Sequence, residues 1–399
     1  MNSMNRIVIF GAGKIARGFV NHLLAISKFK SVFIEKSVAL CELINERGEY
    51  GVNILGNPQK NMKIKDAKAI KLDEFEQAVK AVAETNLIFT AVGGKNLKEI
   101  VPVIAKGFQI RLKEGNITPL NLITCENWKK PADLIKIGVK ELLNKEEQEQ
   151  LDKLMGFSEA VVMRSAIEPN KEALILDPLI VNVQDFWSLI VDAQRLVGEI
   201  PSIKGIELME NFGGFLERKF YTYNAANGTV SFVGSILGYK YIAEASRDEF
   251  VTGVLEKVYK ETSEALCKKH GIALKEQQQF AQSSYKKLRD ENIVDTLERN
   301  ARDPVRKLSY EDRLIGPARL MMDYGVKPDG ILTSIACAIY YNGVDETAIE
   351  LKRIRSQDGV DAVLNNVCGI DPDSELGKLI KERIKELVKK CIIKEKVLI

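Results

Sequence analysis

The stretch RIVIFGAGKIARGF (residues 6–19) constrains the fold of this chain more than any other. An apolar strand leads into a glycine-rich turn and the start of a helix, and this order lets helix-terminal N–H groups hold a pyrophosphate. Gly11 permits the tight turn, and Gly13 permits the backbone to approach the pyrophosphate closely. Ala16 stands at the third glycine position of the dinucleotide fingerprint. The alternative is a turn whose glycines only redirect the chain. The candidate cofactor loop comprises Gly11, Ala12, Gly13, Lys14, Ile15 and Ala16.

Two further strands support a dinucleotide site. The second strand, SVFIEK, ends in Glu35, where a carboxylate accepts hydrogen bonds from the adenosine ribose hydroxyls and repels a 2′-phosphate. This position favours NAD over NADP, although Lys36 follows directly. The strand NLIFTAVGG opens into Val92 and Gly93 at the carboxyl edge of the sheet, where a dinucleotide crosses the switch point. NAD is therefore the expected cofactor, with Glu35, Val92 and Gly93 added to its site.

The remaining pattern predicts an α/β chain of two domains. Up to about residue 130, short apolar runs alternate with helical patterns, which is typical of βαβ units and a parallel sheet. Residues 173–186 are also strand-like, whereas residues 251–271 and 374–392 repeat apolar positions at helical spacing. We expect a Rossmann-like, doubly wound NAD-binding domain over residues 1–200. A mainly α-helical substrate and catalytic domain is expected over residues 201–399.

Composition excludes several classes of function. The 399 residues carry a net charge of +3 with both signs interleaved, which argues against nucleic-acid or membrane surfaces. The six cysteines lack CxxC spacing, and His22 and His270 have no ligand-spaced partner, so no metal site is expected. The chain begins almost directly in a strand, which leaves no room for a signal peptide and predicts a cytoplasmic location. No oligomeric state follows from the sequence.

A lysine in the second half of the chain is the candidate for acid–base chemistry. Phe215, Phe212 and Leu208 precede Lys219 at helical spacing, which places the lysine on a buried stripe. In a continuing α-helix Asn227 projects roughly 80° from Lys219, and Asn224 about 60° beyond it. Burial would lower the pKa of the lysine toward the range of a general base, and the amides would donate to a developing alkoxide. The alternative is a solvated or snorkelling surface lysine.

At these residues the chain resembles the mannitol dehydrogenase family of polyol-specific long-chain dehydrogenases. The resemblance runs nearly end to end, through FGAGKIARGF, TAVGGKNL, TPLNLITCENW, GFSEAVVMRS, IKGIELMENFGGFLERKFYTYNAANG and RKLSYEDRLIGPARL. It implies a zinc-independent enzyme that transfers hydride between NAD and a polyol–ketose pair with a lysine as general acid/base. The small-molecule partner is accordingly expected to be a polyol or ketose.

The resemblance carries over residue by residue. Lys219 matches the family's base, and Asn224 and Asn127 match the two amides that polarise the reacting oxygen. Asn227 stands where the family has a substrate-orienting histidine, and an Asp-Arg pair of the family appears as Met163-Arg164, leaving Arg164 as a substrate-binding candidate. These two departures indicate either a divergent substrate preference or reduced catalytic competence.

Cationic residues predict how a phosphate would be held. Arg306 and Arg313, in VRKLSYEDRLIGP, are the candidates, because guanidinium forks suit phosphate oxygens. The same arginines would alternatively form ion pairs with Glu311 and Asp312. The expected function is interconversion of a hexitol phosphate and a ketose phosphate. A sugar-acid reductase of the same family acting on a keto-uronate, or a catalytically impaired NAD-binding sensor, remains the alternative.

Overall fold

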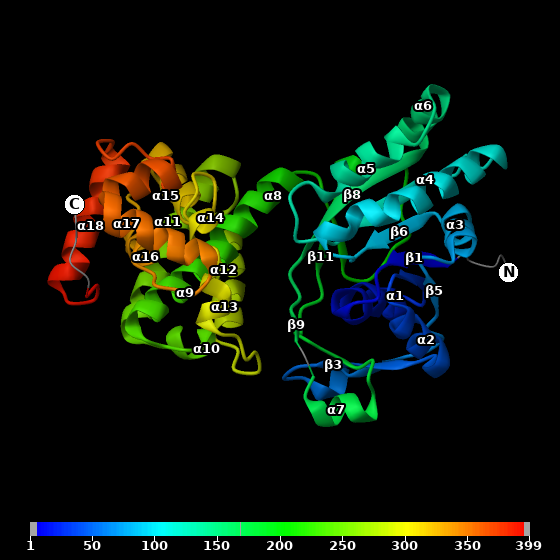
Figure 1. Cartoon of the computed structure of the whole chain (residues 1–399), viewed down its shortest axis with the longest axis horizontal. Coiled ribbons are helices and arrows are strands. Elements are labelled where there is room, and N and C mark those ends of the chain that lie inside the picture. Colours follow the sequence, from blue (N-terminus) through cyan, green and yellow to red (C-terminus); the bar gives the residue numbers. More distant parts are fainter. Residues whose placement is uncertain (1–5, 168, 395–399) are drawn as a thin grey trace. The chain divides into compact units, whose positions relative to one another are not determined.

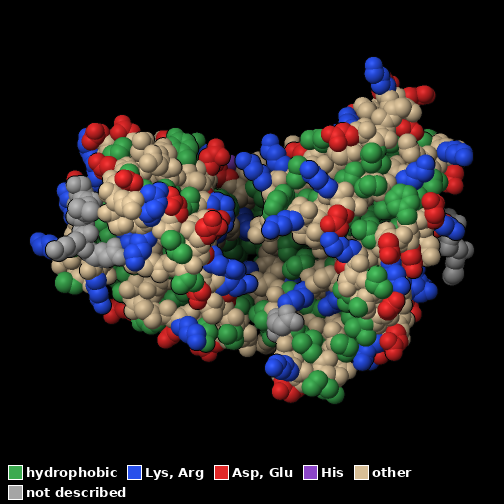
Figure 2. Space-filling model, viewed as in Figure 1, with side chains coloured by type: hydrophobic (Ala, Val, Ile, Leu, Met, Phe, Trp, Pro, Cys, Tyr) green, Lys and Arg blue, Asp and Glu red, His purple; other side chains and the backbone are tan. Residues whose placement is uncertain are grey.

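The computed structural model describes residues 6–167 and 169–394. The chain forms two compact units, Met1–Phe212 and Gly213–Ile399. The first unit extends past the expected limit at residue 200, because strand β12 (Ile206–Met209) pairs in parallel with β11 (Leu189–Asp192). On the face shown in Figure 2, acidic and basic side chains are interspersed over both units.

The first unit is built on an eight-stranded sheet in the order β12-β11-β8-β7-β6-β1-β2-β5. All neighbouring pairs are parallel except β8 and β11, which are antiparallel. The run from β5 to β8 has the order of a dinucleotide-binding sheet, whose direction of winding reverses between β1 and β6. The other strands of this sheet are β1 (Ile7–Phe10), β2 (Ser31–Glu35), β5 (Ala69–Lys71), β6 (Leu87–Thr90), β7 (Leu120–Thr124) and β8 (Met155–Val162).

Helices cover both faces of this sheet (Figure 1). Side chains alternate along a strand, so Val8 and Phe10 of β1 pack with helices α3, α4 and α5, whereas Ile7 and Ile9 pack with α1 and α2. This arrangement confirms the predicted doubly wound, parallel α/β architecture. The helices of the unit are α1 (Asn21–Ile26), α2 (Val38–Arg47), α3 (Phe75–Glu84), α4 (Leu97–Lys113), α5 (Pro131–Glu141), α6 (Lys145–Leu154) and α7 (Lys171–Leu176).

A second, four-stranded sheet in the order β4-β3-β10-β9 belongs to the same unit. Its strands are β3 (Tyr50–Ile54), β4 (Met62–Ile64), β9 (Ala166–Ile167) and β10 (Val181–Val183). The strand-like prediction for residues 173–186 is wrong over its first part. Asn170 accepts a hydrogen bond from the Ala173 N–H and starts α7, whose Ile175 and Leu176 are each 80% exposed. Only 181–183 form a strand.

The second unit is helical, as the sequence predicts. Helix α16 is buried throughout Gly330–Ile339 and packs against α9, α11 and α18. The helical predictions for residues 251–271 and 374–392 correspond to α11 and α18, of which α18 ends already at Lys389, and Gly271 caps α11 with a left-handed φ of 65°. The unit contains α8 (Phe212–Lys219), α9 (Ala225–Leu237), α10 (Ile242–Ala245), α11 (Glu249–His270), α12 (Leu274–Leu288), α13 (Leu297–Ala301), α14 (Pro304–Lys307), α15 (Ile315–Asp323), α16 (Asp329–Ile339), α17 (Glu346–Val363) and α18 (Glu375–Lys389).

Candidate active site

The glycine-rich turn has the geometry that a pyrophosphate requires. Gly11 has a φ of 88°, and a Cβ there would lie 2.6 Å from the carbonyl oxygen of Ala91. A Cβ at Gly13 would have no neighbour within 4 Å, so the backbone at this position is open to a ligand. The helix begins at once, since Arg17 donates its N–H to the Gly13 carbonyl at 2.9 Å. The residues present therefore fit a dinucleotide. The helix opens with a π-helical segment, η1 (Ala16–Val20).

Glu35 lies at the end of β2 and is oriented toward this turn. Its Oε2 accepts a hydrogen bond of 2.7 Å from the Ala12 N–H, and its Oε1 accepts one of 2.8 Å from the Ser37 N–H. Lys36, which follows it, forms an exposed ion pair of 2.9 Å with Glu99. The carboxylate is thus placed beside the cofactor loop, and its role with a ribose stays a prediction.

The two other cofactor candidates, Val92 and Gly93, have their amides engaged by the protein itself. Glu126, the second residue after β7, accepts the Val92 N–H at Oε1 and the Gly93 N–H at Oε2, both at 2.9 Å. The Val92 carbonyl accepts from Asn96 Nδ2 at 2.7 Å. Burial raises the pKa of the Glu126 carboxyl, and the two amides counteract this rise. Val92 and Gly93 can therefore meet a cofactor through packing, while these two N–H groups serve Glu126.

Asn127 directly follows Glu126 and is exposed at the carboxyl edge of the sheet. The next residue, Trp128, lies over Gly94, where an added Cβ would be 2.1 Å from the indole Cδ2. Asn127 belongs to the first unit, whereas Lys219, Asn224 and Asn227 belong to the second.

Lys219 ends α8, and the helix continues through a π-helical turn, η5 (Phe220–Asn224), into α9. The Ala225 N–H donates to the carbonyl of Phe220, five residues back. The expected α-helical angles are therefore wrong here, because a π turn brings residues five apart, such as Lys219 and Asn224, closer to one face. π turns of this kind are frequent at functional sites.

The surroundings of Lys219 lower its basicity. Phe212 and Phe215, on the same helix, are buried, as the sequence predicts, whereas Leu208 lies in β12 and is 54% exposed. Burial, together with the smaller effects of the positive charges of Lys287 and Arg313, lowers the pKa of Lys219 to about 8. The direction of this change agrees with the expected loss of hydration. Lys219 thus has the pKa of a group that exchanges a proton near neutrality.

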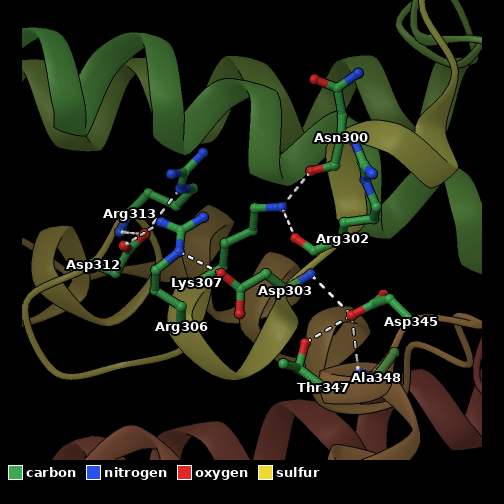
Figure 3. A network of polar contacts seen from close by, with 10 residues as sticks. All are labelled: Asn300, Arg302, Asp303, Arg306, Lys307, Asp312, Arg313, Asp345, Thr347 and Ala348. Atoms are coloured by element: carbon green, nitrogen blue, oxygen red, sulfur yellow. Dashed lines mark hydrogen bonds and ion pairs between the residues drawn. The ribbon is translucent and has the colours of Figure 1, made fainter. Parts of the chain in front are cut away.

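A polar network of the second unit includes Asn300 and Lys307 (Figure 3), and Asn227 joins it through Asn300. Asn227 Nδ2 donates to Asn300 Oδ1 at 3.1 Å. The Nζ of Lys307, a residue only 5% exposed, donates to the backbone carbonyl oxygens of Asn300, at 2.6 Å, and of Arg302. Burial, together with Arg313 and Arg306, lowers the pKa of Lys307 to about 7. Asn227 is therefore linked, through the half-buried Asn300, to the buried amine of Lys307.

The two phosphate candidates both pair with Asp312. Arg313 Nε lies 2.9 Å from Asp312 Oδ1, and Arg306 Nη1 lies 3.2 Å from Asp312 Oδ2. Arg306 Nε also contacts Asp303 Oδ2 at 2.5 Å and its side chain is about half exposed, whereas that of Arg313 is largely buried. Figure 3 shows both guanidinium groups beside the Lys307 side chain. The ion pairs with Asp312, which the sequence analysis gave as the alternative role of these arginines, are therefore present. Phosphate binding by the two arginines stays a prediction.

Arg164 lies in the first unit and is only 2% exposed. Its guanidinium donates to the carbonyl oxygens of Phe186 and Gly18, the latter at 3.0 Å, and its carbon lies 4.5 Å from the Trp187 ring centroid. His22 Nδ1 contacts it at 3.0 Å, and burial with this positive charge lowers the pKa of His22 to about 4. These contacts fasten the cofactor helix to the 186–187 loop, so the structure gives Arg164 a packing role and its contact with substrate stays a prediction.

Three charged residues of these surroundings are absent from the predicted site: Glu126, Lys287 and Lys307. Lys287 lies on α12, and burial lowers its pKa to about 8. The buried residues of α12 include Gln277, Ala281 and Ser284, a stripe too polar to reveal a buried face by hydrophobic periodicity.

Within residues 6–167 and 169–394, no group of three or more His, Cys, Asp or Glu side chains is placed to hold a metal ion. The six cysteines are all free. No helix in the described part of the chain is both long and apolar enough to cross a membrane.

Comparison with known proteins identifies the two units. The family profile described as the mannitol dehydrogenase Rossmann domain matches residues 5–205, and that of the mannitol dehydrogenase C-terminal domain matches residues 211–388. The chain belongs to the mannitol dehydrogenase family. Among curated relatives of this family member, mannitol-1-phosphate 5-dehydrogenase of Thermoanaerobacter pseudethanolicus is 33% identical over 386 residues, covering 96% of this chain and 98% of the relative.

Two solved structures share the fold of this mannitol dehydrogenase family member. A substrate-free D-sorbitol dehydrogenase has a TM-score of 0.81 at 15% identity and covers 97% of this chain and 94% of its own. Mannitol 2-dehydrogenase of Pseudomonas fluorescens, in a ternary complex with NAD and D-mannitol, has a TM-score of 0.72 at 13% identity and covers 98% and 93%. The expected family and fold class are confirmed.

Proposed function

We propose that this chain is an NAD-dependent oxidoreductase that interconverts a hexitol phosphate of the mannitol 1-phosphate type with a ketose phosphate of the fructose 6-phosphate type. The observation that carries the proposal is Lys219, half-buried with a pKa of about 8 and joined to Asn224 by a single π turn. Family membership and the 33% identical mannitol-1-phosphate 5-dehydrogenase support the reaction class and the substrate.

The first unit would hold the cofactor at the Gly11–Ala16 turn, with Glu35 at the adenosine ribose. When bound, NAD accepts or supplies the hydride. The protein's own contribution at this end is a backbone that approaches closely at Gly13 and a carboxylate that favours ribose hydroxyls over a 2′-phosphate.

The chain's side chains then move one proton and stabilise one oxygen. In the oxidation direction the neutral amine of Lys219 accepts the proton of the substrate hydroxyl, and in the reduction direction its ammonium returns a proton to that oxygen. Asn224 donates a hydrogen bond to the same oxygen as negative charge develops on it. In this proposal Asn127 of the first unit supplies the second such donor.

Cationic residues support a phosphorylated substrate. Arg313 and Lys287 are both close enough to Lys219 to lower its pKa, and Arg306 and Arg313 do the same to Lys307. Asp312 and Asp303 offset part of this positive charge, and a phosphate, which carries about two negative charges and accepts hydrogen bonds on three oxygens, would offset more of it. We assign the phosphate to Arg313 in the first place and to Arg306 in the second, because the Arg306 side chain is more exposed.

The test is NADH oxidation by the purified protein with fructose 6-phosphate, fructose, tagaturonate and fructuronate. We expect turnover of fructose 6-phosphate alone. Lys219→Ala should lower it by about a thousandfold or more while NADH still binds. Lys260→Ala is the matched control, because Lys260 is an exposed lysine of the same unit.

Three other outcomes would each support a different mechanism or function. Near-normal turnover in Lys219→Ala would remove the lysine mechanism. Activity on a uronate alone would assign the chain to the sugar-acid reductases. NADH binding without turnover of any substrate would identify an NAD-binding sensor, for which Asn227 and Met163 would be the relevant departures from the family pattern.

A further inference from the structure

The loops that follow strands β6 and β7 are tied together by side chains once their backbone pairing ends. The ladder between the strands closes with Thr90 opposite Thr124 and with the Cys125 N–H donating to the Thr90 carbonyl at 2.9 Å. Beyond this bond the two strands separate. From there on, the Glu126 carboxylate accepts backbone N–H groups, as a strand carbonyl does within the ladder.

The carboxylate of Glu126 binds two consecutive amides of the neighbouring loop. Oε1 accepts the Val92 N–H and Oε2 accepts the Gly93 N–H, each at 2.9 Å, so both oxygens are used and the side chain cannot rotate without losing both bonds. Hydrogen bonds to an ionised acceptor are about twice as strong as those between neutral groups. Glu126 thus fixes the orientation of its own loop relative to residues 92–93.

A second contact, independent of the first, joins the same two loops. The indole of Trp128 lies against Gly94 so closely that a Cβ on Gly94 would fall 2.1 Å from its Cδ2. Gly94 therefore provides the space into which the tryptophan packs. Asn127 stands between the two contacts, with Glu126 before it and Trp128 after it, so both neighbours of Asn127 are held by the loop after β6.

That loop is itself in contact with the cofactor turn. The Ala91 N–H donates to the Phe10 carbonyl at 2.8 Å, and a Cβ added to Gly11 would fall 2.6 Å from the Ala91 carbonyl oxygen. A continuous set of contacts therefore runs from the pyrophosphate turn at Gly11, through residues 91–94, to the loop that carries Asn127.

We propose that Glu126 is a positioning residue that fixes the amide of Asn127 relative to the cofactor turn by clamping the loop after β7 onto the loop after β6. This inference rests on the proposed function, in which Asn127 donates a hydrogen bond to the reacting oxygen. Glu126 touches neither substrate nor the reacting atoms, and it acts through Asn127. Displacing such a donor by about 1 Å is enough to reduce catalysis.

The experiment is a double-mutant cycle on Glu126→Gln and Asn127→Ala, with kcat for fructose 6-phosphate reduction and the Kd of NADH measured for each. The Glu126→Gln substitution keeps the size of the side chain but presents an NH₂ group to one of the two amides. We expect Asn127→Ala to lower kcat about a hundredfold, as for loss of an oxyanion donor, and Glu126→Gln to lower it about tenfold. In the Asn127→Ala background, Glu126→Gln should cost nothing further.

Glu114→Gln is the control, because it removes an exposed carboxylate just after α4, outside these loops, and should leave kcat unchanged. If Glu126→Gln lowers kcat by the same factor with and without Asn127, its role is general stability of the fold and the inference fails. Gly94→Ala breaks the clamp from the opposite loop and should show the same dependence on Asn127, which keeps the test valid if Glu126→Gln folds poorly.

A spectroscopic measurement separates this inference from the proposed function. The chain has only two tryptophans, so subtracting the spectrum of a Trp128→Phe variant, in which only Trp187 emits, isolates the emission of Trp128. We expect Glu126→Gln to shift that emission to longer wavelength, because the indole leaves Gly94 for water. An unchanged emission overturns the clamp. If the native protein turns over none of the substrates, the proposed function fails, while the emission still decides whether Glu126 holds the loop.

Discussion

The pH dependence of turnover should report directly on Lys219. Lowering its pKa from 10.5 to about 8 raises the fraction of neutral amine at pH 7 from about 1 in 3,000 to about 1 in 11. With this pKa, kcat/KM for oxidation of mannitol 1-phosphate should rise about tenfold between pH 7 and pH 9 and then level off. Reduction of fructose 6-phosphate should decline over the same interval, because it requires the protonated amine.

The assay is steady-state oxidation and reduction from pH 7 to pH 10, a range in which the substrate phosphate, with a second pKa of about 6, is already ionised. Lys287→Met adds a perturbation that leaves the reacting groups in place. It removes one of the two positive charges that lower the pKa of Lys219, so the midpoint of the profile should move upward. Arg319→Met, in which a half-buried arginine of α15 is replaced, is the matched control.

Two results would refute this reasoning. The first is an oxidation rate that is still rising at pH 10 with no plateau, as the ordinary lysine pKa of 10.5 requires, which would mean that Lys219 is hydrated like a surface lysine. The second is an unchanged midpoint in Lys287→Met combined with a normal rate, which would mean that the charge of Lys287 does not act on the base. A profile that persists in Lys219→Ala at reduced rate would assign the titration to another group.

The glycine turn, the paired arginines and the half-buried carboxyl of Glu261 each lead to a further expected outcome. Gly11→Ala should lower both the melting temperature and the affinity for NADH, because the left-handed φ costs about 1–2 kcal/mol for alanine and the added Cβ meets Ala91. Gly13→Ala should lower the affinity for NADH alone. Calorimetry and NADH titration distinguish the two variants. Arg313→Ala should raise KM for fructose 6-phosphate about tenfold or more, with a smaller effect of Arg306→Ala, and equal effects on fructose would contradict a phosphate contact. Burial raises the pKa of Glu261 from 4.5 to about 7, so between these pH values the folded chain binds more protons than the unfolded chain. The free energy of unfolding should therefore fall as the pH rises from 4.5 to 7. Glu261→Gln should flatten this dependence in thermal melts, and an unchanged dependence would exclude Glu261 as its source.

The sequence predicts those parts of the molecule in which side-chain type repeats with the backbone. Alternation of strands and helices sufficed for the doubly wound sheet, and the turn from Gly11 to Ala16 marked the cofactor end because Gly11 has no room for a side chain and Gly13 leaves the backbone open. Spacing also placed Lys219 on a buried stripe with Phe212 and Phe215. The prediction from helical spacing failed at Leu208, because α8 begins only at Phe212 and Leu208 lies in strand β12 of the sheet.

The residues that the sequence analysis missed lie where the apolar periodicity of strands and helices gives no information. Glu126 follows a strand, and nothing in its local pattern shows that its carboxylate binds amides of a different loop. In the folded unit Lys287 is half-buried and Lys307 is buried, which single-helix patterns do not register. The strand-like interpretation of residues 173–176 failed because the cap at Asn170 starts a helix whose apolar side chains stay exposed.

The π turn at 220–224 also has a consequence for the length of the chain. A five-residue hydrogen-bonded turn contains one residue more than an α-helical turn, so Lys219 and Asn224, five residues apart, are related as two residues four apart are in an α-helix. Removing one residue between them would let regular α-helical bonding replace the π turn, with little change in the rotation of Lys219 relative to α9. Deleting one of residues 220–223 should therefore leave a fully helical, folded unit that retains turnover, whereas deleting Asn224 itself should abolish turnover.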